Sequence, residues 1–221
     1  MKKLDFNCDM GESYGPWTMG NDDAVMPHVT SINIACGFHG GDAHIMRKTV
    51  ANAIKYQVHI GAHPGLNDLP GFGRRPFPIS PDQAYDLVVV QIGALAAVAK
   101  TQGGRLHHVK THGALYNMAA NNDALSRAIA QAVMDIDGSL VLYALANSRQ
   151  AFIAQEMGLQ VAHEVFADRS YQDDGTLTPR STPGAIISDP IQAIQQVISM
   201  LEKGHVTALS GKQIPIQADT L

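Results

Sequence analysis

Short apolar runs alternate with longer amphipathic stretches along this 221-residue chain. This alternation is typical of βαβ units, in which successive strands pair in parallel and helices cover the sheet. The pattern therefore predicts an α/β fold with at least six strands. The predicted strands cover residues 4–8, 31–35, 58–62, 106–110, 140–144 and 160–165.

Helix signals lie between these runs. Residues 189–204 begin with an Asp-Pro pair, carry apolar residues on one helical face and end in glycine. Residues 80–103 begin with Ser-Pro and a glutamine placed for a capping box. Two further helices are predicted at 42–56 and 122–136. Residues 64–78 contain glycines, prolines and paired arginines without a period, which predicts a long loop.

Composition and charge restrict the possible partners. No repeat, low-complexity segment or linker divides the chain, so we predict a single domain over residues 1–221. The formal net charge of -4 leaves no excess positive potential, so neither nucleic acid nor an anionic membrane is an expected partner. The start of the sequence lacks the apolar run of a signal peptide, and no uninterrupted apolar stretch approaches roughly 20 residues. We therefore expect a cytoplasmic location.

Ionisable side chains gather where the predicted strands end. In parallel α/β folds the active site lies at the carboxyl ends of the strands, because the loops there converge on one ligand. Period-2 alternation places His108, Lys110 and His112 on one side, which we expect to face the barrel mouth. The other groups at strand ends are Asp9, Glu12, His39, Asp42, His63, Glu164, Asp168 and Arg169.

Several of these residues also have an ordinary structural interpretation. Asp42 precedes a predicted helix and serves equally well as its N-cap. Arg74 and Arg75 are either a solvated loop pair or a clamp for a substrate carboxylate or phosphate. His59 and His107 fall early or out of phase in their strands, so we expect them to be packed or surface histidines.

Missing motifs restrict the chemistry. The chain has neither a G-x-x-x-x-G-K-[ST] loop nor a G-x-G-x-x-G turn, so any ATP chemistry would need another chain or an unfamiliar site. It also lacks a G-x-S-x-G elbow and a catalytic cysteine signature. General acid and base catalysis by Asp, His and Lys remains.

Six sequence blocks resemble the hallmark blocks of the LamB/YcsF family. They follow in the family's order across nearly the whole chain, which makes the resemblance specific. The blocks are 5–12 (DFNCDMGE), 33–42 (NIACGFHGGD), 60–64 (IGAHP), 71–75 (GFGRR), 108–117 (HVKTHGALYN) and 164–169 (EVFADR) continuing to 180.

The resemblance implies a distorted (β/α) barrel similar to that of polysaccharide deacetylases. It also implies that the chain is one component of a hydrolase that opens a cyclic amide, namely by ATP-dependent conversion of 5-oxoproline to L-glutamate together with subunits B and C. Those partner subunits are expected to bind ATP. Members of the family usually continue past the position of Leu221 into a further strand and helix, so the resemblance predicts a barrel that is incomplete at the C-terminus.

The leading hypothesis assigns chemistry to the residues at the strand ends. Asp9 or His112 would act as the general base on water, and Lys110 would stabilise the developing oxyanion. The predicted catalytic residues are Asp9, His39, His63, Lys110 and His112. The predicted substrate-binding residues are Asn7, Glu12, Arg74, Arg75, Asp168 and Arg169.

Two alternatives remain open. The chain could be a free-standing metal-dependent amidohydrolase or deacetylase, with His39, Asp42, His63 and His112 as candidate ligands of a divalent ion. It could also be a scaffold that positions subunits B and C without chemistry. A scaffold does not need ionisable residues at so many strand ends, so the sequence favours an enzyme.

Overall fold

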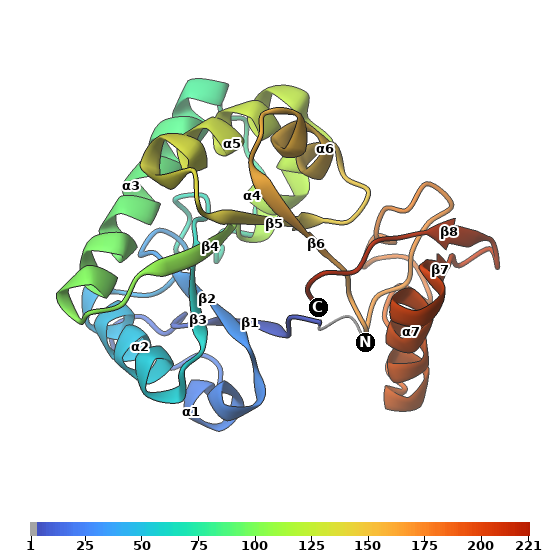
Figure 1. Ribbon diagram of the computed structural model, residues 1–221, viewed down its shortest axis with the longest axis horizontal. Coiled ribbons are helices and arrows are strands. Elements are labelled where there is room, and N and C mark those ends of the chain that lie inside the picture. Colours follow the sequence, from blue (N-terminus) through green and yellow to red (C-terminus); the bar gives the residue numbers. More distant parts are fainter. Residues whose placement is uncertain (1–3) are drawn as a thin grey trace.

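A curled six-stranded parallel sheet forms the centre of the computed structural model, which describes residues 4–221 (Figure 1). Its strands follow one another in sequence order, each paired with the next. They are β1 (Asn7–Met10), β2 (Ser31–Ala35), β3 (His59–His63), β4 (Leu106–Lys110), β5 (Val141–Leu145) and β6 (Gln160–Glu164). The predicted parallel α/β fold is thus confirmed, with the first strand shifted toward the C-terminus.

Helices surround the outer side of this sheet (Figure 1). Their ends carry the predicted signals: Ser80 and Gln83 form a capping box, and Asp42, Asn122 and Asp189 accept hydrogen bonds from the first turns that follow them. The helices are α1 (Asp22–Val25), the 3-10 turn η1 (Met26–His28), α2 (Ala43–Tyr56), α3 (Pro81–Thr101), α4 (Gly113–Ala119), α5 (Asp123–Asp137), α6 (Arg149–Glu156) and α7 (Pro190–Lys203).

The two faces of the sheet differ in polarity. Alternate strand residues such as Ile32, Ile34 and Val109 pack with the helices in the main apolar core. The residues between them, such as Asn33 and Lys110, point the other way and carry polar groups. The interior of the curled sheet is therefore polar, and this lining positions the candidate site.

The two edges of the sheet are joined by residues 219–221. The backbone N–H of Asn7 donates to the carbonyl of Leu221 at 2.9 Å, and that of Val165 donates to the carbonyl of Thr220 at 2.9 Å. Thr220 forms parallel bridges both with Asp5, next to β1, and with Glu164 in β6. This short segment therefore lies between β1 and β6.

A small lobe lies beside the barrel (Figure 1). It contains α7 and the antiparallel pair β7 (His205–Thr207) and β8 (Gln213–Pro215). Its apolar side chains, among them Tyr171, Met200 and Val206, form a cluster distinct from the main core. The single domain over 1–221 stays a prediction.

Within residues 4–221, α3 is the helix that is long and apolar enough to cross a membrane. Over an 18-residue window of this 21-residue helix the mean hydropathy is 1.4, which the sequence prediction overlooked because polar residues interrupt the run. A core helix of a soluble protein has the same composition, and Val88, Ile92 and Leu95 of α3 are buried in the main core. The cytoplasmic location stays a prediction.

Candidate functional site

Lys110 occupies the polar interior of the barrel at the end of β4. Its Nζ lies 2.7 Å from Glu164 Oε1, 3.2 Å from Asp9 Oδ1 and 3.1 Å from Asn7 Oδ1, so its three N–H groups have three acceptors. Burial opposes the charged form, but attraction by Asp9 and Glu164 outweighs it and raises the pKa of Lys110 above its usual value. The side chain is therefore a fixed ammonium ion.

Glu164 is a site residue that the sequence interpretation missed. It is 1% exposed at the end of β6, and besides Lys110 it accepts hydrogen bonds from Tyr116 Oη at 2.7 Å and Asn7 Nδ2 at 3.1 Å. Its position at a strand end was a usable signal. The prediction instead moved on to Asp168, which is exposed on the surface.

Asn33 and His108 support the polar residues around Lys110 through hydrogen bonds. Asn33 Nδ2 donates to Asn7 Oδ1 at 2.7 Å and to Asp9 Oδ1 at 2.8 Å, and its own Oδ1 accepts from His108 Nε2 at 2.8 Å. The His108 ring stacks on Tyr143 with centroids 3.9 Å apart. It points inward as predicted, but it supports the site through Asn33.

The His108 ring fits because β3 has a glycine opposite it. A Cβ at Gly61 would lie 2.0 Å from His108 Nε2, closer than any real contact. The loop glycine Gly73 has φ of +62°, and a Cβ there would lie 2.7 Å from that of His39. Glycines thus let neighbouring backbone approach the histidine rings.

Asp9 connects the ammonium of Lys110 to a group of histidines. Its Oδ2 lies 3.4 Å from His63 Nε2, and its side chain retains 37% exposure. Burial favours the neutral acid, but the charges of His63 and Lys110 and the hydrogen bond from Asn33 lower the pKa of Asp9 well below its usual value. Asp9 is therefore an accessible carboxylate that stays ionised.

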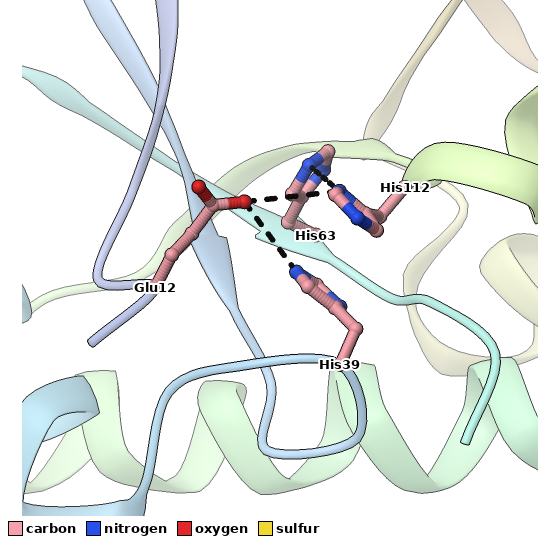
Figure 2. Close-up of side chains that lie close together, drawn as sticks. All are labelled: Glu12, His39, His63 and His112. Atoms are coloured by element: carbon pink, nitrogen blue, oxygen red, sulfur yellow. Dashed lines mark hydrogen bonds and ion pairs between the residues drawn. The ribbon is translucent and has the colours of Figure 1, made fainter. Parts of the chain in front are cut away.

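Glu12, His39, His63 and His112 form a cluster whose donor atoms all lie within 4.8 Å of one another (Figure 2). His63 Nε2 and His112 Nδ1 are 2.9 Å apart. Glu12 Oε1 lies 3.6 Å from His39 Nε2 and 3.7 Å from His112 Nδ1. All three histidines are buried. The four residues come from separate loops and strand ends that lie far apart in the sequence.

Burial sets the charges in this cluster. It lowers the pKa of His39 to about 3, helped by the neighbouring His63, and that of His112 to about 3, helped by His63 and His39. Burial also raises the pKa of Glu12. His39 and His112 are therefore neutral imidazoles near pH 7, which have a free lone pair.

An apolar pocket opens onto the cluster. It has a volume of about 410 Å³, with Glu12 and His39 among its lining residues. The rest of its lining is Tyr14, Trp17, Met19, Gly40, Leu69, Pro70 and Phe72. A larger pocket of about 620 Å³ near His59 and His107 lies at the amino ends of β3 and β4. The smaller pocket is the candidate substrate site, because it reaches the ionisable groups at the carboxyl ends.

The structure brings most of the predicted site residues together. Asp9, His39, His63, Lys110 and His112 lie in the two connected groups, with Asn7 and Glu12. Arg74 lies close by, with its guanidinium 5.1 Å from the Phe72 ring centroid. His59 and His107 stack on each other with centroids 4.2 Å apart, as packed histidines outside the site.

Two predicted residues have local partners instead. The Asp42 carboxylate accepts from the backbone N–H groups of Gly15, His44 and Ile45, so it is an N-cap. Its assignment as a metal candidate stays a prediction, and the cluster of possible ligands contains Glu12 in its place. Arg75 extends to the surface and pairs with Asp68, and its part in a substrate clamp stays a prediction.

Asp168 and Arg169 lie in the loop that follows β6. Arg169 is buried and donates to the carbonyl of Thr178 at 2.6 Å. The Asp168 side chain is exposed. Their substrate-binding roles stay predictions.

A parallel barrel with a paired cation, an ionised carboxylate and a buried His/Glu cluster at its carboxyl ends belongs to the class of α/β-barrel enzymes. The chain belongs to the LamB/YcsF family, whose sequence profile matches residues 4–221. This confirms the resemblance seen in the sequence blocks.

Known relatives match over almost the whole chain. A protein of Bordetella pertussis, named as the A subunit of 5-oxoprolinase, is 62% identical over 99% of this chain and 86% of its own length. One of the same name from Brevibacillus brevis is 58% identical, covering 100% of this chain and 87% of its own. The crystal structure of a lactam utilization protein from Thermus thermophilus superposes with a TM-score of 0.96 at 45% identity, covering 100% of this chain and 89% of that one.

Proposed function

We propose that this chain is the A subunit of a 5-oxoprolinase, which opens the lactam ring of 5-oxoproline to give L-glutamate. The names of relatives that are 62% and 58% identical support this assignment. The observation that carries the chemistry is the pairing of the ionised, accessible Asp9 with the fixed ammonium of Lys110.

The proposed reaction adds water to the lactam carbonyl and breaks the ring C–N bond, and the leaving nitrogen takes up a proton. Asp9 Oδ2, which lies 3.4 Å from His63 Nε2, has a further lone pair that can accept a hydrogen bond from that water. Its low pKa makes it a weak base, so it orients water toward a carbonyl that is already activated. His112 is less suited to this role, because its ring nitrogens face His63 and the carbonyl of Phe72.

Lys110 has two tasks in this proposal. It keeps Asp9 ionised and oriented, and its charge offsets the negative charge that develops on the lactam oxygen. We assign the substrate carboxylate to Arg74, beside Phe72 on the pocket wall.

ATP belongs to the proposed complex as a whole. The chain contains no nucleotide-binding motif, so we propose that subunits B and C bind ATP and activate the lactam before this chain acts.

Reconstitution tests this function. Purified subunits B and C with this chain should convert 5-oxoproline and ATP to glutamate, and Asp9→Asn should lower the rate about 100-fold or more. Asp86→Asn is the matched control, because Asp86 is exposed on α3. Equal turnover by subunits B and C without this chain would contradict the assignment. If turnover requires the chain but Asp9→Asn keeps full activity, the result would favour the scaffold hypothesis.

The second candidate is a free-standing metal-dependent amidohydrolase or deacetylase. The four-donor cluster of Glu12, His39, His63 and His112 favours it. The two candidates separate on one measurement. A free-standing enzyme opens a lactam or releases acetate without ATP and without partner chains, whereas the proposed 5-oxoprolinase component needs both.

A further inference from the structure

Backbone carbonyls fix which nitrogens of His63 and His112 carry hydrogen. His63 Nδ1 lies 2.7 Å from the carbonyl oxygen of Lys110, and His112 Nε2 lies 2.8 Å from that of Phe72. A carbonyl oxygen only accepts, so both of these nitrogens are N–H donors. In the neutral rings the two remaining nitrogens, 2.9 Å apart, therefore face each other with lone pairs. Such a contact is repulsive unless a cation meets it.

In the other two members of the cluster, buried side-chain atoms lack a hydrogen-bond partner. Among the residues that the structure describes, neither ring nitrogen of His39 has a hydrogen bond, and neither does Glu12 Oε1. His39 is 1% exposed, so bulk solvent does not replace the missing partner. A buried polar group without a partner is costly, and its usual explanation is a bound water or ion.

We propose that Glu12, His39, His63 and His112 bind one divalent transition-metal ion. A single shared proton would relieve the contact between His63 and His112 but would leave His39 and Glu12 unpartnered. One dication meets all four donors. Three imidazoles and a carboxylate suit Zn²⁺, Co²⁺, Mn²⁺ or Fe²⁺ rather than Mg²⁺ or Ca²⁺, which prefer oxygen ligands.

The surroundings fit such a site. Ligand histidines usually donate their second N–H to a carbonyl or carboxylate, as His63 and His112 do. Ligand atoms about 2.0–2.2 Å from a metal lie roughly 3 Å apart, close to the distance between His63 Nε2 and His112 Nδ1. The His39 ring is stacked parallel on the His112 ring, with the ring centroids 3.7 Å apart. Binding of His39 to the ion therefore requires a rotation of its ring. Because Asp9 contacts His63, the ion would lie beside Asp9.

Metal binding is independent of the proposed function. A role of the ion in lactam opening, however, rests on the proposed function. The whole chain, treated with a chelator and dialysed, is titrated with Zn²⁺ by calorimetry and with Co²⁺ by visible absorption. We expect one ion per chain with a submicromolar Kd. His112→Asn and Glu12→Gln should each weaken binding at least 10-fold.

His59→Asn is the matched control, because His59 stacks on His107 outside the cluster and its loss should leave affinity unchanged. Circular dichroism of each variant checks folding, and Glu12→Gln keeps the test valid if a histidine variant does not fold. Failure to bind a stoichiometric ion, or equal affinity in Glu12→Gln and wild type, overturns the inference. The reconstituted complex separates the two proposals. Glutamate formation by a chain that binds no metal overturns the metal inference alone. A bound ion without glutamate formation supports the metal inference and contradicts the proposed function.

Discussion

Lys110 is surrounded by acceptors on three sides, so its removal exposes the other charges. Lys110→Met would leave Glu164, which is 1% exposed, and the partly buried Asp9 without their cation. Removing one partner of a buried ion pair costs about 3–5 kcal/mol, because the remaining charge is not solvated. We expect urea unfolding at pH 7.5 to show a loss of that size.

The controls separate charge from packing. Lys48→Met changes a lysine whose side chain is 60% exposed and should alter stability by less than about 0.5 kcal/mol. The double variant Lys110→Met with Glu164→Gln should regain part of the loss, because one orphaned carboxylate is gone. A Lys110→Met chain as stable as wild type would contradict the paired-cation interpretation.

His108 gives the protein a predictable response to acid. Burial, reinforced by the charges of His107 and Lys110, lowers the pKa of His108 well below its usual value, so the folded chain keeps this ring neutral. The unfolded chain takes up a proton at about pH 6.5. Below that pH the unfolded state binds more protons, and stability falls by up to about 1.4 kcal/mol per pH unit for each such group.

The measurement is the free energy of unfolding between pH 7.5 and 5, in chelating buffer so that no metal contributes. His39 and His112, with pKa values of about 3, add to the same acid loss. His108→Gln, whose amide can still donate to Asn33, should reduce the slope by up to one proton. An unchanged slope would show that His108 does not titrate on unfolding.

At the scale of elements, local signals gave most of the helices and strands. The capping box at Ser80 and the N-cap at Asp189 are formed by residues within one turn of the helix, so the sequence contains the whole cause. The first strand was predicted at 4–8 but spans Asn7–Met10, because its extent follows its pairing with β2. Three short helices, α1, α4 and α6, and the 3-10 turn η1 were missed. For α4 the reason is physical, since its N-cap, His112, makes no capping bond.

The site residues divide in the same way, into those that local signals indicate and those that depend on the folded structure. Lys110 and His63 were predicted because strand order alone brings parallel strand ends to one edge. The partnership of Lys110 with Glu164 depends on which strands face each other across a closed interior, so no local pattern contains it. Asp42 and Arg75, whose roles in the site stay predictions, illustrate the opposite case. Each has a partner nearby in sequence, backbone amides for Asp42 and Asp68 for Arg75.

Asp42→Ala tests its structural assignment. Loss of a helix N-cap typically costs about 1 kcal/mol, and this carboxylate also holds the backbone N–H of Gly15. We expect a lower free energy of unfolding, with Zn²⁺ affinity and reconstituted turnover unchanged. Asp42→Ser, which can still cap α2, should recover most of the stability. A marked fall in metal affinity would place Asp42 in the site after all.

At the scale of the whole molecule, Thr220 joins the two ends of the sheet. It is fully buried, its Oγ1 donates to Asp5 Oδ2 at 2.6 Å, and the same oxygen accepts from Asn7 Nδ2 at 2.8 Å. Thr220→Val keeps the shape but removes both bonds, which should cost about 1–3 kcal/mol. Thermal and urea unfolding measure the loss, and Thr207→Val on exposed β7 is the control. Equal losses in the two variants would contradict a special role for the closure.

The closing contact joins Asp5 and Thr220, which are 215 positions apart in the sequence. Contacts of such high sequence separation form late in folding, because the entropy of closing the intervening loop must be overcome first. During translation, β1 is made early but its outer edge has no partner until residue 219 has left the ribosome. The nascent chain therefore presents two open sheet edges, the surfaces through which partly folded β-structure aggregates. Chaperone demand during synthesis should accordingly persist until residues 219–221 have emerged.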